Sequence, residues 1–112
     1  MAARSGASHI DSLRAMRPTV HMDGKVDSVV DHPAFVSIIR SYADLYDMQE
    51  GEDRDALTYE EDGVRHGMSF LVPRTEEDLV ARREAARIWA QYSGGMLGRT
   101  GDYLNAGLTA FS

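Results

Sequence analysis

The chain has 112 residues, of which 43% are apolar and 27% are charged, and its formal net charge is −6. A chain of this length can form one small domain with a single core, and its acidic balance argues against a nucleic-acid binder or a membrane-surface protein. No apolar run approaches the roughly 18 residues of a membrane span, and the absence of cysteine removes disulfides, thiolate metal sites and iron–sulfur clusters, which fits a cytoplasmic protein.

The first predicted elements are a short helix and a tight hairpin. Apolar residues at helical spacing predict a helix over about residues 8–16, and Pro18 ends it. The apolar positions of this helix are Ile10, Leu13 and Met16. Residues 20–26 then form two short predicted strands around Asp23-Gly24, a pair that is typical of tight hairpin turns.

The clearest helical pattern begins at His32-Pro33, because proline suits the first position of a helix. His32 itself is expected to act as a turn or capping residue. The apolar residues that follow lie on one face of the helix along its whole length. They are Phe35, Ile38, Ile39, Tyr42, Leu45 and Tyr46.

A second hairpin is predicted after an acidic segment. Residues 50–55 are expected to form a solvated loop. Strands are expected over residues 57–59 and 68–72, on either side of the turn residues Glu61-Asp62-Gly63, and Pro73 closes the hairpin.

A long helix is predicted from Thr75 to about Tyr92. Thr75 is a favourable N-cap, and the acidic residues of the first turn and the later arginines match the helix dipole. Gly94-Gly95 then breaks the helix. The side chains expected to be buried are Leu79, Ala86 and Trp89.

The last predicted helix begins near Thr100 and is apolar around nearly its whole circumference. A domain of this size does not offer enough protein to bury such a helix on all sides. The elements therefore predict a mainly α domain with two small β-hairpins over residues 1–112, which is expected to be the first part of a longer protein.

The segment Gly98-Arg99-Thr100-Gly101-Asp102-Tyr103 is the most informative for function. Arg99 and Tyr103 are four residues apart, so on a helix both side chains can point at one polar group in an apolar pocket. A guanidinium and a phenol arranged in this way can hold and ionise a phenol. Taken alone, such a pair is more often a surface arginine and a core tyrosine. The four histidines have no ligand-like spacing, so no metal site is expected.

A set of short segments in a defined order carries a resemblance to a known family. The segments are Ser12-Leu13-Arg14, Asp23-Gly24-Lys25-Val26, His32-Pro33-Ala34-Phe35, Leu45-Tyr46-Asp47, Ser69-Phe70-Leu71-Val72-Pro73-Arg74, Asp78-Leu79 and Gly98-Arg99-Thr100-Gly101-Asp102-Tyr103. Their order and spacing resemble the N-terminal domain of the 4-hydroxyphenylacetate 3-hydroxylase family, from about Ser8 to Ser112. The ordered set is more specific than any one of its motifs.

This resemblance implies an acyl-CoA dehydrogenase-like fold with a helical N-terminal domain, a middle β-domain and a C-terminal helical bundle. The present chain corresponds to the first of these. The resemblance also implies an oxidoreductase, namely the oxygenase component of a two-component flavin monooxygenase in aromatic compound catabolism. Such an enzyme uses O2 and reduced FAD from a separate flavin reductase to hydroxylate a phenol next to its existing hydroxyl group. Family members usually form homotetramers, so a homo-oligomer is expected.

In this family, the segment that matches Gly98–Tyr103 supplies an arginine and a tyrosine that contact the phenolic hydroxyl. The resemblance therefore assigns substrate-binding and catalytic roles to Arg99 and Tyr103. The family usually has proline where this chain has Gly101. Its third phenol-contacting group, a histidine, and its flavin-binding domain lie beyond residue 112. We therefore expect the chain alone to be inactive, and its flavin-binding residues are unknown.

Two alternatives differ in class from this hydroxylase. The first is a non-catalytic remnant or interaction domain that uses its last helix to bind a partner. The second is a relative of 4-hydroxybutyryl-CoA dehydratase, which resembles the same family in fold. That dehydratase relies on cysteine ligands to an iron–sulfur cluster, and the present chain has no cysteine.

Overall fold

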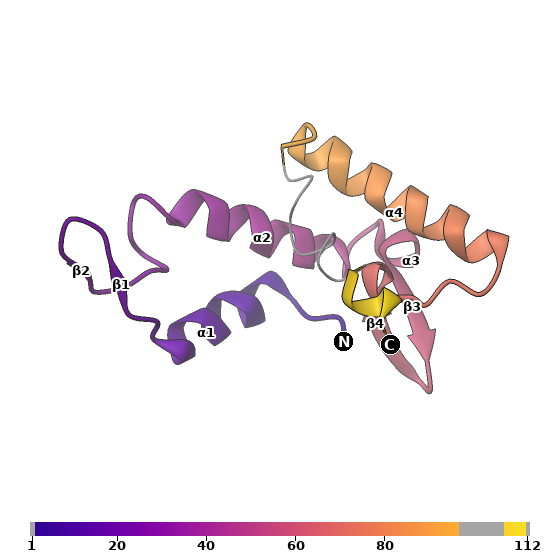
Figure 1. Cartoon of the computed structure of the whole chain (residues 1–112), viewed down its shortest axis with the longest axis horizontal. Helices are drawn as coiled ribbons and strands as arrows, with labels where there is room; N and C mark the ends of the chain where they lie inside the picture. Colours follow the sequence, from indigo (N-terminus) through magenta and orange to yellow (C-terminus); the bar gives the residue numbers. More distant parts are fainter. Residues whose placement is uncertain (1, 97–106, 112) are drawn as a thin grey trace. The chain divides into compact units, whose positions relative to one another are not determined.

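The computed structural model describes residues 2–96 and 107–111, and most of its elements are helices (Figure 1). The elements are α1 (Gly6–Met16), β1 (Val20–His21), β2 (Lys25–Val26), α2 (Val36–Met48), α3 (Arg54–Leu57), β3 (Thr58–Glu61), β4 (Val64–Gly67), the 3-10 helix η1 (Met68–Phe70) and α4 (Glu76–Ser93). The chain divides into two compact units. We call residues 4–51 the α1–α2 unit, and residues 1–3 together with 52–112 the α4 unit. The mainly helical fold with two small hairpins is the one that the sequence predicts.

In the α1–α2 unit, α1 and α2 run antiparallel and pack against each other (Figure 1). α1 starts two residues earlier than predicted, because the Ser5 side chain caps it by accepting a hydrogen bond from the Ser8 N–H over 3.2 Å. At this end Gly6 is buried, and its N–H donates to Asp47 Oδ1 on α2 over 2.7 Å. The other end is capped by Arg17, whose backbone is in the left-handed conformation.

α2 begins later than the sequence predicts. Pro33 belongs to a turn that precedes the helix, and the first helical residue is Val36. His32 is a turn residue, one of the two roles expected for it, because its carbonyl accepts from the N–H groups of Phe35 and Val36 and its Nδ1 accepts from the Ala34 N–H over 3.1 Å. The N-cap of α2 is Phe35 instead, and no side chain caps it. The residues of α2 that are buried are Ile39 and Ala43.

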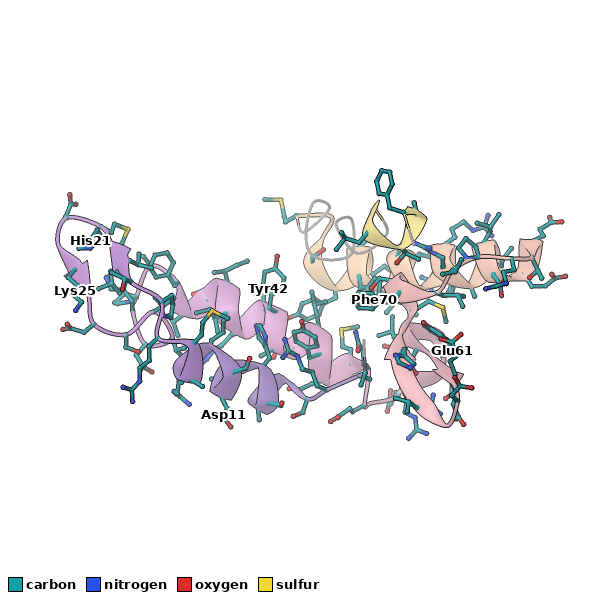
Figure 2. The ribbon with its side chains drawn as sticks, turned by 60° about the horizontal axis from the view of Figure 1, so that its bottom comes forward. Asp11, His21, Lys25, Tyr42, Glu61 and Phe70 are labelled. Carbon is teal, nitrogen blue, oxygen red and sulfur yellow. The ribbon has the colours of Figure 1, made fainter. Side chains whose placement is uncertain are left out.

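The β1–β2 hairpin confirms the predicted turn. Val20 pairs with Val26 and His21 pairs with Lys25, and both members of the Asp23-Gly24 pair have positive φ angles, of 51° and 129°. His21 and Lys25 lie on the two strands of this hairpin (Figure 2).

In the α4 unit, the second hairpin has a different second strand from the one predicted. β3 pairs with β4, residues 64–67, whereas residues 68–70 form η1. Asp62 and Gly63 have φ angles of 52° and 74°, which suit a two-residue hairpin turn. Because this turn pairs Glu61 with Val64, the returning strand starts directly after it. The loop predicted over residues 50–55 also ends early, since α3 begins at Arg54.

The N-terminal residues of the α4 unit lie along the outer edge of β4. Ala2 forms a bridge with His66, and the Ala3 N–H donates to the Arg65 carbonyl over 2.8 Å. The edge of β4 is therefore paired where it would otherwise present free backbone groups.

α4 confirms its predicted cap but buries a different face. The buried residues are Ala85 and Ile88, whereas the expected Leu79 is 57% exposed, Ala86 is exposed and Trp89 is half-buried. The apolar residues of α4 are spread around the helix, so their spacing does not select one stripe. The packing of α4 against α3 and η1 selects it instead.

The last predicted helix is described only from residue 107. Residues 107–110 are helical, and Leu108 and Phe111 are exposed. The predicted start near Thr100, together with Arg99 and Tyr103, lies outside the described residues.

Candidate functional site

The predicted phenol-contacting residues, Arg99 and Tyr103, follow an α4 that is well defined at both ends. At its C-terminal end, Gly94 and Gly95 have φ angles of 59° and 79°. The Gly95 N–H donates to the Ala90 carbonyl over 2.9 Å, which satisfies a carbonyl of the last helical turn. A Cβ on either glycine would meet no described atom within 4 Å, so these glycines serve the turn of the backbone.

The N-terminal end of α4 carries a complete capping box. Thr75 Oγ1 accepts from the Asp78 N–H over 3.2 Å, and Asp78 Oδ2 accepts from the N–H groups of Arg74 and Thr75 over 2.8 and 3.0 Å. These backbone donors hold the pKa of Asp78 below its ordinary value. Further along, Arg82 Nη1 donates to the Leu71 carbonyl over 2.8 Å and ties α4 to the segment after η1. The helix that leads to the predicted site is therefore fixed by polar contacts as well as by packing.

A polar cluster in the α1–α2 unit was missed by the sequence analysis. Arg4 Nη2 lies 3.2 Å from His9 Nδ1 and donates to Tyr46 Oη over 3.3 Å, and the guanidinium carbon lies 4.8 Å from the Tyr46 ring centre. The rings of His9 and Tyr46 are 4.7 Å apart. Because a guanidinium only donates, His9 Nδ1 is the acceptor in this contact. Tyr42 and Tyr46 of α2 fit the predicted apolar face, and their spacing gave no sign that an arginine lies over the Tyr46 ring.

The environment of His9 favours the neutral form of its ring. Burial, and next the positive charge of Arg4, lower the pKa of His9 below its ordinary value of 6.5. A neutral ring is the form that can accept the hydrogen bond from Arg4. The cluster joins the segment before α1 to α2, and we assign it a structural role.

A second cluster lies on the β3–β4 hairpin. Tyr59 and His66 are cross-strand partners whose stacked rings are 5.4 Å apart, and Tyr59 Oη donates to the Phe70 carbonyl over 3.3 Å. Burial, and next the charge of Glu61, raise the pKa of Tyr59, so its hydroxyl remains a donor. Glu61 lies close to the hairpin turn and Phe70 lies away from it (Figure 2). These contacts hold the hairpin against the segment that follows it.

Neither a cluster of metal ligands nor a membrane-spanning helix is found among the described residues. No three histidine, aspartate or glutamate side chains within residues 2–96 and 107–111 gather closely enough to hold a metal ion. Among the helices that the structure describes, none is long and apolar enough to cross a membrane.

Comparisons with known proteins cover nearly the whole chain. The family model for the N-terminal part of 4-hydroxyphenylacetate 3-hydroxylase matches residues 5–112. The chain is 47% identical over 112 residues to the 4-hydroxyphenylacetate 3-monooxygenase oxygenase component of Thermus thermophilus, covering 98% of this chain and 23% of that protein. It is 42% identical over 113 residues to the corresponding component of Geobacillus sp., covering 98% of this chain and 23% of that protein.

Solved structures give the same picture of the fold. A crystal structure of the oxygenase component of 4-hydroxyphenylacetate 3-monooxygenase, complexed with FAD and 4-hydroxyphenylacetate, matches with a TM-score of 0.93 and 48% identity. The match covers 97% of this chain and 23% of that one. The chain thus spans about a quarter of the length of these relatives, and the predicted acyl-CoA dehydrogenase-like N-terminal fold is confirmed.

Proposed function

The chain belongs to the 4-hydroxyphenylacetate 3-hydroxylase family, and on this basis we propose that the protein containing it is the oxygenase component of a two-component aromatic monooxygenase. The proposed reaction converts a phenol, O2 and reduced FAD into a catechol, water and oxidised FAD. The observation that carries the proposal is the match to the family model over residues 5–112, with 47% identity to the Thermus relative. The substrate class is a phenol of the 4-hydroxyphenylacetate type.

In this proposal Arg99 supplies charge and Tyr103 supplies orientation. A guanidinium keeps its positive charge at every physiological pH, so Arg99 next to the phenolic oxygen favours the phenolate. A phenolate pushes electron density onto the ortho carbon, which is the position to be hydroxylated. A hydrogen bond from Tyr103 to the same oxygen holds the ring in one orientation. Both residues therefore act on the substrate oxygen.

The glycines that follow α4 do not form a dinucleotide-binding motif. Gly94 and Gly95 follow the end of a helix, whereas a dinucleotide pyrophosphate is held by the glycine-rich start of one. From the family resemblance we place the flavin-binding domain after residue 112, and we name no flavin-binding residue in this chain. When bound there, reduced FAD would supply the two electrons that activate O2, one atom of which is transferred to the phenol while the other leaves as water.

The remaining partners follow from the same assignment. We propose that a separate flavin reductase supplies reduced FAD, that both components work in the cytoplasm, and that the oxygenase is a homo-oligomer, as homotetramers are usual in the family. Without the middle and C-terminal domains, the 112 residues are expected to be inactive. The absence of cysteine speaks against the dehydratase alternative.

Arg99→Ala in the protein expressed from its complete open reading frame tests the proposal. The assay measures O2-dependent catechol formation with 4-hydroxyphenylacetate and reduced FAD. We expect kcat/KM to fall by about 10²-fold or more, as for the loss of other groups that stabilise developing charge. Arg83→Ala is the matched control, because Arg83 is exposed on α4. If the Arg99 and Arg83 variants are equally active, the role of Arg99 is refuted, and if the unmodified protein forms no catechol, the proposed activity is refuted.

A further inference from the structure

We propose that a cavity in the α1–α2 unit binds a small organic carboxylate with an apolar body. This cavity, which we call the hairpin cavity, has a volume of about 440 Å³ and lies between the end of α1, strand β2 and residues 27–31. Its volume falls within the roughly 300–1,000 Å³ of small-molecule sites. The proposal is independent of the proposed hydroxylase function, because Arg99 and Tyr103 take no part in it.

One side of the hairpin cavity is apolar. Leu13 of α1 is half-buried there, and Val26 and Val30 are only 6% and 7% exposed. Val26 and Val30 are largely covered by protein, so Leu13 offers most of the apolar surface that a hydrocarbon or aromatic body can contact.

The charged side chains of the lining leave two cations available. Arg14 Nη2 lies 3.6 Å from Asp31 Oδ1, and Arg14 Nη1 lies 3.6 Å from Asp11 Oδ1, so its charge is already matched. Neither Arg17 nor Lys25 forms an ion pair with another residue that the structure describes. Asp27 is the remaining carboxylate of the lining. Two free cations against one carboxylate favour a ligand with a single negative charge.

The backbone of Arg17 is the observation that singles out its side chain. Arg17 has φ 45° and ψ 56°, the left-handed conformation in which helices usually place glycine. A side chain there carries a steric cost that glycine avoids. Strained backbone positions of this kind cluster at functional sites. Lys25 lies on β2, where its backbone pairs with that of His21 (Figure 2).

An NMR titration of the 112-residue chain with phenylacetate tests this proposal. Phenylacetate has a carboxylate and an aromatic body but lacks the phenolic hydroxyl that the proposed function assigns to Arg99. We expect saturable shifts of backbone amide signals within residues 13–31, with a Kd on the order of 1 mM. 2-Phenylethanol, which has a similar shape and no charge, is expected to bind at least about tenfold more weakly.

Variants of the two free cations complete the test. Arg17→Gly keeps the left-handed backbone and therefore the fold, but it is expected to weaken phenylacetate binding about tenfold, as is Lys25→Met. Arg40→Ala, at an exposed position of α2 outside the cavity, should bind as the unmodified chain does. The proposal is overturned if phenylacetate shifts no signals within residues 13–31, if 2-phenylethanol binds equally well, or if Arg17→Gly leaves the Kd unchanged.

Discussion

Replacing Gly6 by alanine should destabilise the α1–α2 unit, although alanine is the better helix former. Gly6 is the first residue of α1 and is buried against α2. A Cβ at this position would lie 2.7 Å from Asp47 Oδ2 and closer still to the carbonyl oxygen of Ala43. Because that oxygen belongs to the backbone of a helix, it cannot turn away as a side chain would. α1 would have to shift away from α2.

The size of the effect follows from three contributions. Overpacking of a well-packed site costs about 1–3 kcal/mol. The shift also weakens the hydrogen bond from the Gly6 N–H to Asp47, and a bond to a charged group contributes about 1.5–3 kcal/mol. The higher helix propensity of alanine offsets at most about 1 kcal/mol. We therefore expect a net loss of about 2–3 kcal/mol in the free energy of unfolding.

Urea unfolding followed by circular dichroism measures this loss. Gly51→Ala is the matched control, because a Cβ there would lie 3.6 Å from the Asp47 carbonyl oxygen, which is an ordinary contact. It should change the unfolding free energy by no more than about 0.5 kcal/mol. If Gly6→Ala is as stable as the unmodified chain, or more stable, then helix propensity outweighs the contact and the reasoning is wrong.

Two further predictions concern the α4 cap and the His9 cluster. Thr75→Ala removes the side-chain acceptor for the Asp78 N–H and should lower the unfolding free energy by about 1 kcal/mol. Thr75→Ser keeps a hydroxyl acceptor and should lose much less stability than Thr75→Ala. Equal urea midpoints for both variants would contradict the capping role. The pKa of His9 in the folded chain lies below the value of 6.5 that applies to the unfolded chain. As the pH falls below about 6.5, the unfolded state therefore binds more protons at His9 than the folded state does, and the free energy of unfolding should decrease. His9→Gln should reduce this dependence of stability on pH, which urea midpoints measured on either side of about pH 6.5 would show. An unchanged dependence in the variant would exclude His9 as its source.

Local chemistry allowed several elements to be predicted from sequence. Thr75 and Gly94 mark the ends of α4 by their own side-chain and backbone properties, so neither depends on distant contacts. Asp23-Gly24 and Asp62-Gly63 likewise mark both hairpin turns. The prediction of a strand over residues 68–72 was wrong, because it followed the apolar character of these residues. It did not consider that a two-residue turn at Asp62-Gly63 makes the returning strand start at Val64.

Properties that depend on packing were harder to predict. Leu79 is exposed because another side of α4 packs against α3 and η1. The spacing of apolar residues within α4 does not indicate which side that is. The Arg4 cluster joins residues 42 positions apart in sequence, so no local pattern indicates it. For the site, residue type and spacing suggested Arg99 and Tyr103, and the family gave them roles, which stay a prediction.

The pairing of Ala3 with Arg65 has a consequence for how the chain is made. The α1–α2 unit is inserted between two pieces of the α4 unit, since residues 1–3 precede it and residues 52–112 follow it. During translation, Ala3 leaves the ribosome before the α1–α2 unit, and its partner strand leaves after it. The helices α1 and α2 can therefore pair while the edge of the later hairpin does not yet exist. The entropic cost of closing that long loop grows only with the logarithm of its length. The length of the loop therefore adds little to the free-energy cost of this pairing, but the pairing must wait until β4 has been synthesised.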